Sequence, residues 1–253
     1  MLKIAIELVP RDEASLLAEL EVVKSDFPDI DTINIPDLLR YDLRSWEGCV
    51  YAQDRYKSAI PHIRAIDIDL DKPLPMGDFL QKHHIREVLV ITGDLPQDMK
   101  WKIYPSTSIE VIRKFKEELP GIKVYAGIDQ YRDSMRKETD YIRRKIQAGA
   151  DGFFTQPFFD LRLMEIYAEI LAGQEVYWGI SPVTSEKSLS YWETKNNVVF
   201  PACFKPNLSW NIMFARQALQ FTRQSDTNIY FMPIRTDVKS YLQGIFGGAQ
   251  AGS

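Results

Sequence analysis

The sequence predicts a single closed (β/α)8 barrel, an α/β TIM barrel, and three observations favour this fold. Short runs of β-branched and aromatic residues alternate with longer amphipathic segments, which is typical of parallel strands joined by helical crossovers. Several of these runs, such as Val88–Ile91, are almost continuously apolar, as expected for strands that are buried on both faces. The length of 253 residues also suits such a barrel, which typically occupies about 250 residues.

Eight short segments fit strands, and amphipathic stretches lie between them. The predicted strands are Lys3–Val9, Asp31–Pro36, His62–Ile68, Glu87–Thr92, Lys123–Ile128, Gly152–Thr155, Val176–Ile180 and Asn228–Pro233. The predicted helices include Glu13–Ser25, Ser108–Glu118, Arg136–Ala148, Leu161–Leu171 and Trp210–Arg223. We expect one domain over residues 1–246 and a flexible tail over 247–253. A doubly wound open sheet is the alternative, but no Gly-x-Gly-x-x-Gly follows the first strand, where a dinucleotide-binding fold has one.

Composition excludes several classes of protein. A net charge of −4 gives no global reason to bind nucleic acid or an anionic membrane. Only Cys49 and Cys203 occur, without C-x-x-C spacing, which argues against a disulfide framework and a structural zinc site. We expect no signal peptide in the first residues, because their apolar run is short and Glu7 interrupts it, and no apolar run approaches the roughly 20 residues of a membrane span. We therefore expect a cytoplasmic protein without a metal site.

Catalytic side chains of such barrels come from the carboxyl ends of the strands and the loops that follow them. The polar residues at or near those predicted positions are Glu7, His62, Arg64, Asp94, Asp129, Gln156, Ser181 and Arg235. Carboxylates, an amide and arginines that converge on one mouth could bind and protonate a polar heterocycle.

Each candidate also has a structural explanation. Glu7 lies inside an apolar strand, where an unpaired carboxylate is costly to bury, so function is favoured over a core ion pair. Asp94 fits a turn or a helix cap equally well, Gln156 fits a strand end, and His62 fits a hydrogen-bonded core position. The basic pair Arg144-Lys145 fits a solvated helix face better than a phosphate site.

Six short motifs occur in order along nearly the whole chain. They are Glu7-Leu8-Val9-Pro10-Arg11, Pro61-His62, Gly93-Asp94-Leu95-Pro96, the block from Arg144 to Asp160, Gly179-Ile180-Ser181-Pro182-Val183, and Arg235. The block contains Arg-Lys, then Ala-Gly-Ala, then Thr-Gln-x-Phe-Phe-Asp, and it is the most specific of the six. Together the motifs resemble those of the methylenetetrahydrofolate reductase family, folate-dependent flavoenzymes that are built on a barrel.

The resemblance implies a role for each matching residue at the substrate. Glu7 would be the general acid that opens the five-membered ring of methylenetetrahydrofolate, and Asp94 would lie near both flavin and pterin. Gln156 would hydrogen-bond the folate, Trp192 would stand in for a stacking phenylalanine, and Arg235 would help to hold the substrate. A carboxylic acid in a partly apolar pocket can donate a proton near neutral pH.

The resemblance also implies FAD as cofactor and NAD(P)H as co-substrate. The residues it places at the flavin are His62, Asp94, Tyr104, Arg144, Lys145 and Ala150. Some flavin-lining motifs of the family differ here: Asn34-Ile35-Pro36-Asp37 replaces Thr-Tyr-Gly, Thr92 replaces an arginine, Gly127-Ile128 replaces Tyr-Pro, and Tyr131 replaces a histidine. We therefore expect FAD to bind more weakly than is usual in the family.

The implied activity is the interconversion of 5,10-methylenetetrahydrofolate and 5-methyltetrahydrofolate by hydride transfer from or to NAD(P)H through FAD, in either physiological direction. Two alternatives remain: direct hydride transfer between NAD(P)H and folate without flavin, and a non-catalytic folate-binding accessory subunit. Glu7 argues against the second, because a pure binder needs no buried acid. The expected partners are tetrahydrofolate derivatives, with neither nucleic acid nor membrane, and a homo-oligomer is left open.

Overall fold

Eight parallel strands close into a barrel in the computed structural model, which describes residues 2–95 and 102–247. The strands are β1 (Ile4–Glu7), β2 (Thr32–Ile35), β3 (Ser58–Arg64), β4 (Glu87–Ile91), β5 (Lys123–Ile128), β6 (Gly152–Pro157), β7 (Val176–Ile180) and β8 (Asn228–Phe231). Each strand pairs with the next along the chain, and β8 pairs with β1. The predicted barrel is confirmed, and the open-sheet alternative is wrong.

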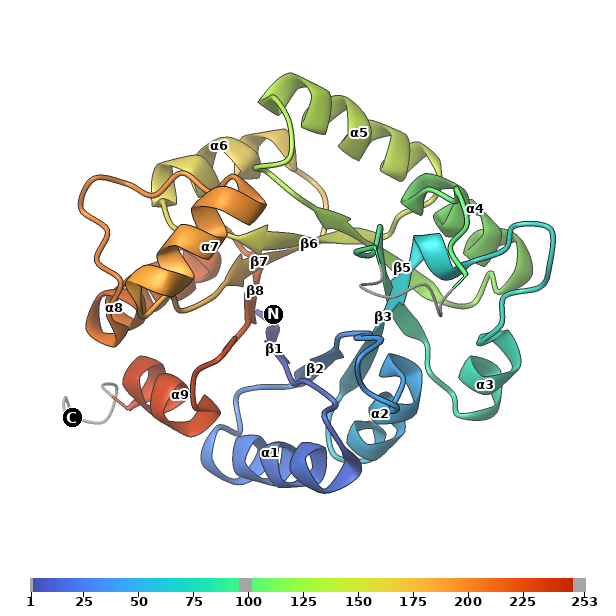
Figure 1. The fold of residues 1–253 in the computed structure, drawn as a ribbon, viewed down its shortest axis with the longest axis horizontal. Helices are drawn as coiled ribbons and strands as arrows, with labels where there is room; N and C mark the ends of the chain where they lie inside the picture. The colour runs from blue at the N-terminus through green and yellow to red at the C-terminus, as the bar shows by residue number, and fades with distance from the viewer. Residues whose placement is uncertain (1, 96–101, 248–253) are drawn as a thin grey trace.

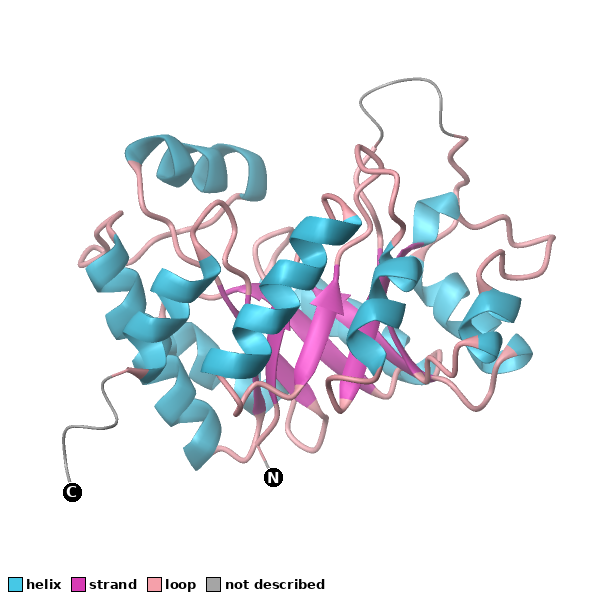
Figure 2. Ribbon diagram, turned by 90° about the horizontal axis from the view of Figure 1, so that it is seen from below, coloured by secondary structure: helices cyan, strands magenta, loops and turns pink. Residues whose placement is uncertain are grey.

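Helices surround the barrel (Figure 1). They are α1 (Glu13–Asp26), α2 (Ser45–Gln53), α3 (Gly77–Lys82), α4 (Ser108–Glu118), α5 (Met135–Gln147), α6 (Leu161–Ile170), α7 (Glu186–Asn196), α8 (Leu208–Gln224) and α9 (Val238–Phe246). Two helices, α7 and α8, follow β7, and α7 packs over the carboxyl ends of the strands (Figure 2). The barrel mouth is thus partly roofed on the β6–β7 side.

The barrel interior is filled by side chains and forms the floor of the mouth. The buried residues that point inward are Ala5, Ile60, Leu89, Tyr125, Phe154, Tyr177, Tyr230 and Met232. Phe154 stacks on Tyr177 with ring centroids 4.1 Å apart, and Tyr230 meets the edge of Phe154 at 5.1 Å. Since such a packed interior leaves no pore, a ligand can bind only above it.

Two strands differ from the sequence prediction in ways that affect the mouth. β3 begins at Ser58 and ends at Arg64, because it pairs with β2 from Thr32 onward, and Ala65–Asp67 form a 3₁₀ turn instead of continuing the strand. β6 extends to Pro157, with a register shift against β7 between Phe154 and Pro157. Bulges of this kind re-aim side chains beside functional sites.

The ends of the chain add little to the site. The domain boundary at residue 246 stays a prediction, and the proposed tail beyond Gly247 lies outside the described residues. No helix in the described part of the chain is long and apolar enough to cross a membrane. Cys49 is buried and Cys203 is exposed, and both are free thiols.

Candidate active site

A cleft of about 370 Å³ opens at the carboxyl ends of β2 to β6. Its polar lining includes Asp37, Arg64, Asp94, Asp129, Lys145 and Gln156, and its walls include backbone of Thr92–Gly93 and Gly127–Ile128. The volume lies within the roughly 300–1,000 Å³ of small-molecule sites. The predicted location of the active site at this end of the barrel therefore coincides with a real cavity.

Glu7 is the last residue of β1, and its side chain is only 13% exposed. Burial raises the pKa of its carboxyl to about 7, although the hydrogen bond that the Tyr230 hydroxyl donates to Oε2 opposes this rise. The Nε2 atom of His62 lies 4.0 Å from Oε2 of Glu7. The carboxyl is therefore poised to exist in both protonation states near neutral pH, as a general acid requires.

His62 stands beside Glu7 on β3. Its Nε2 lies 3.3 Å from Nδ2 of Asn34, and its backbone carbonyl accepts a hydrogen bond of 2.7 Å from the Ser45 hydroxyl. Burial lowers the pKa of His62 to about 4, against the opposite influence of Asp37. The ring is therefore neutral at pH 7 and forms no ion pair with Glu7.

A chain of charged groups crosses the mouth from α2 to the β4 loop. Arg44 binds both carboxylate oxygens of Asp37, through Nε at 2.9 Å and Nη2 at 2.5 Å. Arg64 donates from Nε to Asp67 at 2.9 Å and from Nη2 to the Asp94 carbonyl at 2.6 Å. These bonds fix the backbone at Asp94 and leave its carboxylate exposed beside the cleft.

Gly93 allows this arrangement. Its φ is +89°, a conformation that residues with a Cβ adopt at a cost, and an added Cβ would lie 3.0 Å from Cβ of Arg64. The glycine therefore lets the β4 loop pass directly over Arg64.

Two cations lie on the α5 side of the mouth. Lys145 is 2% exposed, donates from Nζ to the Gly127 carbonyl at 2.5 Å, and lies over the Tyr141 ring at 4.2 Å. Burial lowers its pKa to about 8. Arg132 reaches the same cleft and pairs with the buried Glu138 at 2.5 Å.

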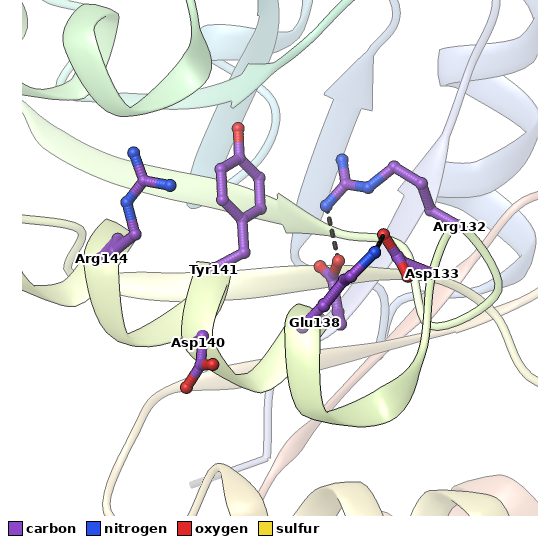
Figure 3. A pocket seen from close by; sticks show the side chains of 7 residues that line it. Arg132, Asp133, Glu138, Asp140, Tyr141 and Arg144 are labelled. Carbon is purple, nitrogen blue, oxygen red and sulfur yellow. Dashed lines mark hydrogen bonds and ion pairs between the residues drawn. The ribbon is translucent and has the colours of Figure 1, made fainter.

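A second cavity of about 410 Å³ lies along α5 and is joined to the cleft by Arg132, which lines both. Figure 3 shows Arg132 directed toward Glu138, with Tyr141 and Arg144 side by side along the helix. Arg144 is exposed in this second cavity rather than in the cleft itself.

Gln156 is presented by the irregular end of β6. Gln130 holds that backbone by donating from Nε2 to the carbonyls of Gln156 at 2.9 Å and Pro157 at 3.0 Å. The Gln156 side chain is consequently exposed to the cleft. At the end of the neighbouring strand β5, partial burial raises the pKa of Asp129 above its usual value.

Several predicted residues are not among those that line the cleft: Glu7, His62, Tyr104, Ala150, Trp192 and Arg235. Arg235, with φ +55°, follows β8 and lies 5.9 Å from the ring of Tyr191 on α7. Tyr104 is half-buried and donates its backbone N–H to the Ile66 carbonyl. Ala150 precedes β6, at the end of the barrel opposite to Gln156, so the structure does not bring it to the mouth and we leave it out of the site.

Trp192 faces the barrel from α7 but is packed rather than open. It is 7% exposed and belongs to a small cluster with Phe159, Val183 and Val198, whereas its neighbour Tyr191 is 50% exposed. Of the two adjacent aromatics, Trp192 is therefore the buried one. Its stacking on a substrate stays a prediction.

The packing of Trp192 leads to an expected result. Trp192→Ala should lower the free energy of unfolding by about 3 kcal/mol, because large buried aromatics cost roughly that much to truncate. Thermal unfolding measured together with the Michaelis constant checks this. An unchanged melting temperature with a raised Michaelis constant would contradict it and support a substrate-stacking role.

Several residues that shape the site were not singled out from the sequence. Tyr230 could have been found from the two-residue alternation of β8, which points Tyr230 and Met232 inward. The roles of Gln130 and Arg44 have no local signal, since both depend on contacts across the fold.

The model of the methylenetetrahydrofolate reductase family matches residues 47–213, which contain strands β3 to β7 and most of the residues that line the cleft, whereas Glu7 and Pro36–Leu38 lie before the matched range. The chain belongs to this family. It is 26% identical over 148 residues to the 5,10-methylenetetrahydrofolate reductase of Pectobacterium carotovorum subsp. carotovorum, covering 56% of this chain and 50% of the relative. The same enzyme of Escherichia coli (strain K12) is 26% identical over 149 residues, covering 57% and 50%. These alignments thus span about half the length of the curated relatives.

Solved structures show the same fold at low sequence identity. One is an uncharacterised protein from Clostridium thermocellum that binds two copies of 5-methyl-5,6,7,8-tetrahydrofolic acid, with a TM-score of 0.60, 13% identity, and coverage of 97% of this chain and 93% of that one. Another is oxaloacetate acetylhydrolase, with a TM-score of 0.58, 12% identity, and coverage of 95% and 78%. At these identities the likeness concerns the barrel alone.

Proposed function

We propose that this member of the methylenetetrahydrofolate reductase family interconverts 5,10-methylenetetrahydrofolate and 5-methyltetrahydrofolate, with FAD as cofactor and NAD(P)H as co-substrate. The observation that carries the proposal is the carboxyl of Glu7, which lies at the barrel mouth with its pKa raised to about 7. The names of the curated relatives and the methyltetrahydrofolate bound by a structural neighbour support the substrate class.

The chain's own groups supply acid catalysis and orientation. Protonated Glu7 donates its proton to one of the two nitrogens that the methylene carbon bridges. The carbon–nitrogen bond to that nitrogen then breaks and leaves an iminium that can accept a hydride. Neutral His62 places no positive charge beside Glu7 that would lower the pKa of the carboxyl. Burial therefore keeps the pKa of Glu7 near neutrality. We assign Asp94 and Gln156 to hydrogen bonds with the pterin, and Arg235 to the outer part of the folate.

The charges around the cleft fit a phosphate-bearing cofactor. Arg64, Arg132 and Lys145 line the cleft, and Arg144 lines the adjoining cavity along α5. Arginine forks and lysine ammonium groups are common phosphate donors. Lys145, Arg132 and Arg144 would hold the FAD pyrophosphate, and bound FAD would carry the hydride. Arg64 and Arg132 already pair with Asp67 and Glu138, so cofactor phosphates must compete with these carboxylates.

The departures from the family's flavin motifs lead to a further expected result for FAD. Contacts at Ile35, Thr92 and Gly127 that the resemblance would require are absent, and each lost contact costs on the order of 1 kcal/mol. Three such losses weaken binding by roughly a hundredfold. We expect purified protein to contain FAD in only a fraction of molecules, with added FAD restoring absorbance near the flavin bands and raising folate turnover.

Titration of the cofactor-free protein with FAD, followed by absorbance and activity, checks the assignment. Activity without FAD that saturating FAD does not change would remove the flavin and favour direct hydride transfer from NAD(P)H to the folate. Folate binding without turnover under any of these conditions would instead favour the accessory-subunit alternative.

A further inference from the structure

A tyrosine inside the barrel contacts the carboxyl of Glu7 from below. Tyr230 belongs to β8, which pairs with β1, and its hydroxyl donates a hydrogen bond to Oε2 of Glu7. The ring is 2% exposed and is held edge-on against Phe154, with centroids 5.1 Å apart. The hydroxyl therefore has a fixed position, and it cannot reach solvent.

We propose that Tyr230 is a positioning residue for the acid: its hydroxyl fixes the carboxyl at the barrel mouth and directs the transferable proton to Oε1. This inference rests on the proposed function, in which Glu7 is the proton donor. It adds a residue to that chemistry which no motif of the sequence indicates.

The position of the proton follows from the direction of the hydrogen bond. In a protonated carboxyl one oxygen carries the proton and the other acts as the acceptor. Because the phenol donates to Oε2, Oε2 is the acceptor, and the proton belongs on Oε1. Burial and the nearby Glu7 carboxylate raise the pKa of Tyr230 well above its usual value, so the phenol remains a donor throughout the physiological range.

The groups that face Glu7 from the neighbouring strands favour the same arrangement. Asn34 of β2 is in register with Glu7, and His62 of β3 lies 4.0 Å from Oε2. The Asn34 amide nitrogen can only donate, so the neutral imidazole accepts at Nε2 in its 3.3 Å contact with Asn34. Asp37 is the charged group that acts on His62 from the end of β2. Among the residues that the structure describes, Tyr230 is therefore the one that donates to this carboxyl.

The test compares two Tyr→Phe variants of the barrel interior. Tyr230→Phe removes the hydroxyl that contacts Glu7 and retains the ring. Tyr177→Phe is the matched control, because Tyr177 is equally buried, stacks on the same Phe154, and belongs to the neighbouring strand. The titration of Glu7 is followed directly by infrared difference spectroscopy of the carboxyl band, identified by its loss in Glu7→Gln.

In Tyr230→Phe we expect the Glu7 pKa to rise by about one unit, a tenfold change in the ionisation constant, because a hydrogen bond to the carboxylate is lost. The alkaline limb of turnover should move by the same amount. At pH 5, where both enzymes carry a protonated Glu7, kcat should fall about tenfold with little change in KM. Tyr177→Phe should move none of these quantities.

Two outcomes would overturn the inference. One is an unchanged carboxyl titration in Tyr230→Phe, and the other is an equal shift in Tyr177→Phe, which would indicate a general effect of the interior. The infrared titration requires no turnover, so an inactive wild-type protein with a shifted carboxyl band would contradict the proposed function while leaving the contact established.

Discussion

Replacing Glu7 with glutamine should reduce folate turnover by about 10²–10⁴-fold, which is the range that a general acid contributes. Glutamine matches glutamate in size and still accepts the Tyr230 hydrogen bond, but it has no proton to transfer. Reduction of bound flavin by NAD(P)H should remain nearly intact, since that step needs no acid at this position. Stopped-flow measurement of the two half-reactions separates these effects.

Glu87→Gln is the matched control for this substitution. Glu87 is also a partly buried glutamate that accepts a hydrogen bond from an interior tyrosine, Tyr125, at 3.1 Å. It lies at the first residue of β4, at the other end of the barrel from the cleft. Near-normal folate turnover in Glu7→Gln, or an equal loss in Glu87→Gln, would contradict the assignment of Glu7 as the acid.

The raised pKa of Glu7 also predicts the pH dependence of both activity and stability. Turnover that consumes methylenetetrahydrofolate should fall as the pH rises through about 7, where the acid loses its proton.

The pKa of Glu7 in the folded protein lies above the value of 4.5 for an unperturbed glutamate. This group therefore favours folding below pH 4.5, and its contribution to the free energy of unfolding is lost as the pH rises to about 7. The loss amounts to about 3 kcal/mol. Glu7→Gln lacks this dependence, and urea unfolding at pH 5 and pH 8 should reveal the difference.

Replacing Gly179 with alanine should destabilise the protein by about 3 kcal/mol and lower its melting temperature by about 10 °C. An added Cβ would overlap the Thr155 carbonyl oxygen and lie 2.7 Å from Cε of Met232. The carbonyl belongs to the backbone of β6 and cannot move aside. The clash lies where β6 and β7 shift register, so the presentation of Gln156 should suffer as well.

Gly121→Ala is the control for Gly179→Ala, because a Cβ at Gly121 would meet no atom within 4 Å. Differential scanning calorimetry of both variants, with folate affinity measured below the melting temperature, checks the expectation. Equal melting temperatures for the two variants would show that the β6–β7 junction relaxes freely and does not constrain the site.

The elements that the sequence predicted well are those whose signals are local. The helix Ser108–Glu118 and the strands Lys123–Ile128 and Val176–Ile180 have the predicted bounds. Thr107 and Glu110 form a capping box at the start of α4, and β7 is buried along its whole length. β3 was displaced in the prediction, because its start is set by pairing with β2 and polar residues such as Ser58 carry no apolar signal.

The candidate site residues also divide into those with a local sequence signal and those whose position depends on contacts across the fold. Glu7 could be predicted because a carboxylate within an apolar strand is unusual in any context, and strand order alone places Gln156 near Asp94 at the mouth. The motif placed Ala150 at the flavin, but Ala150 lies between a helix and the strand that follows it, and this order of elements puts it at the opposite end of the barrel. His62 was expected along the cofactor, and closure of the barrel brings it beside Glu7.

The sequence by itself determined the barrel, the family, and the end of the barrel at which the cleft opens, because alternating apolar runs and ordered motifs are properties of the linear chain. Only the tertiary structure decided the protonation behaviour of the Glu7 carboxyl. Burial of Glu7 requires all eight strands to close around it, and its partners Tyr230 and His62 lie 223 and 55 residues away along the chain. A pKa depends on the solvent that surrounding groups exclude and on the hydrogen bonds they supply, and residues so distant in sequence contribute both only after the barrel has closed.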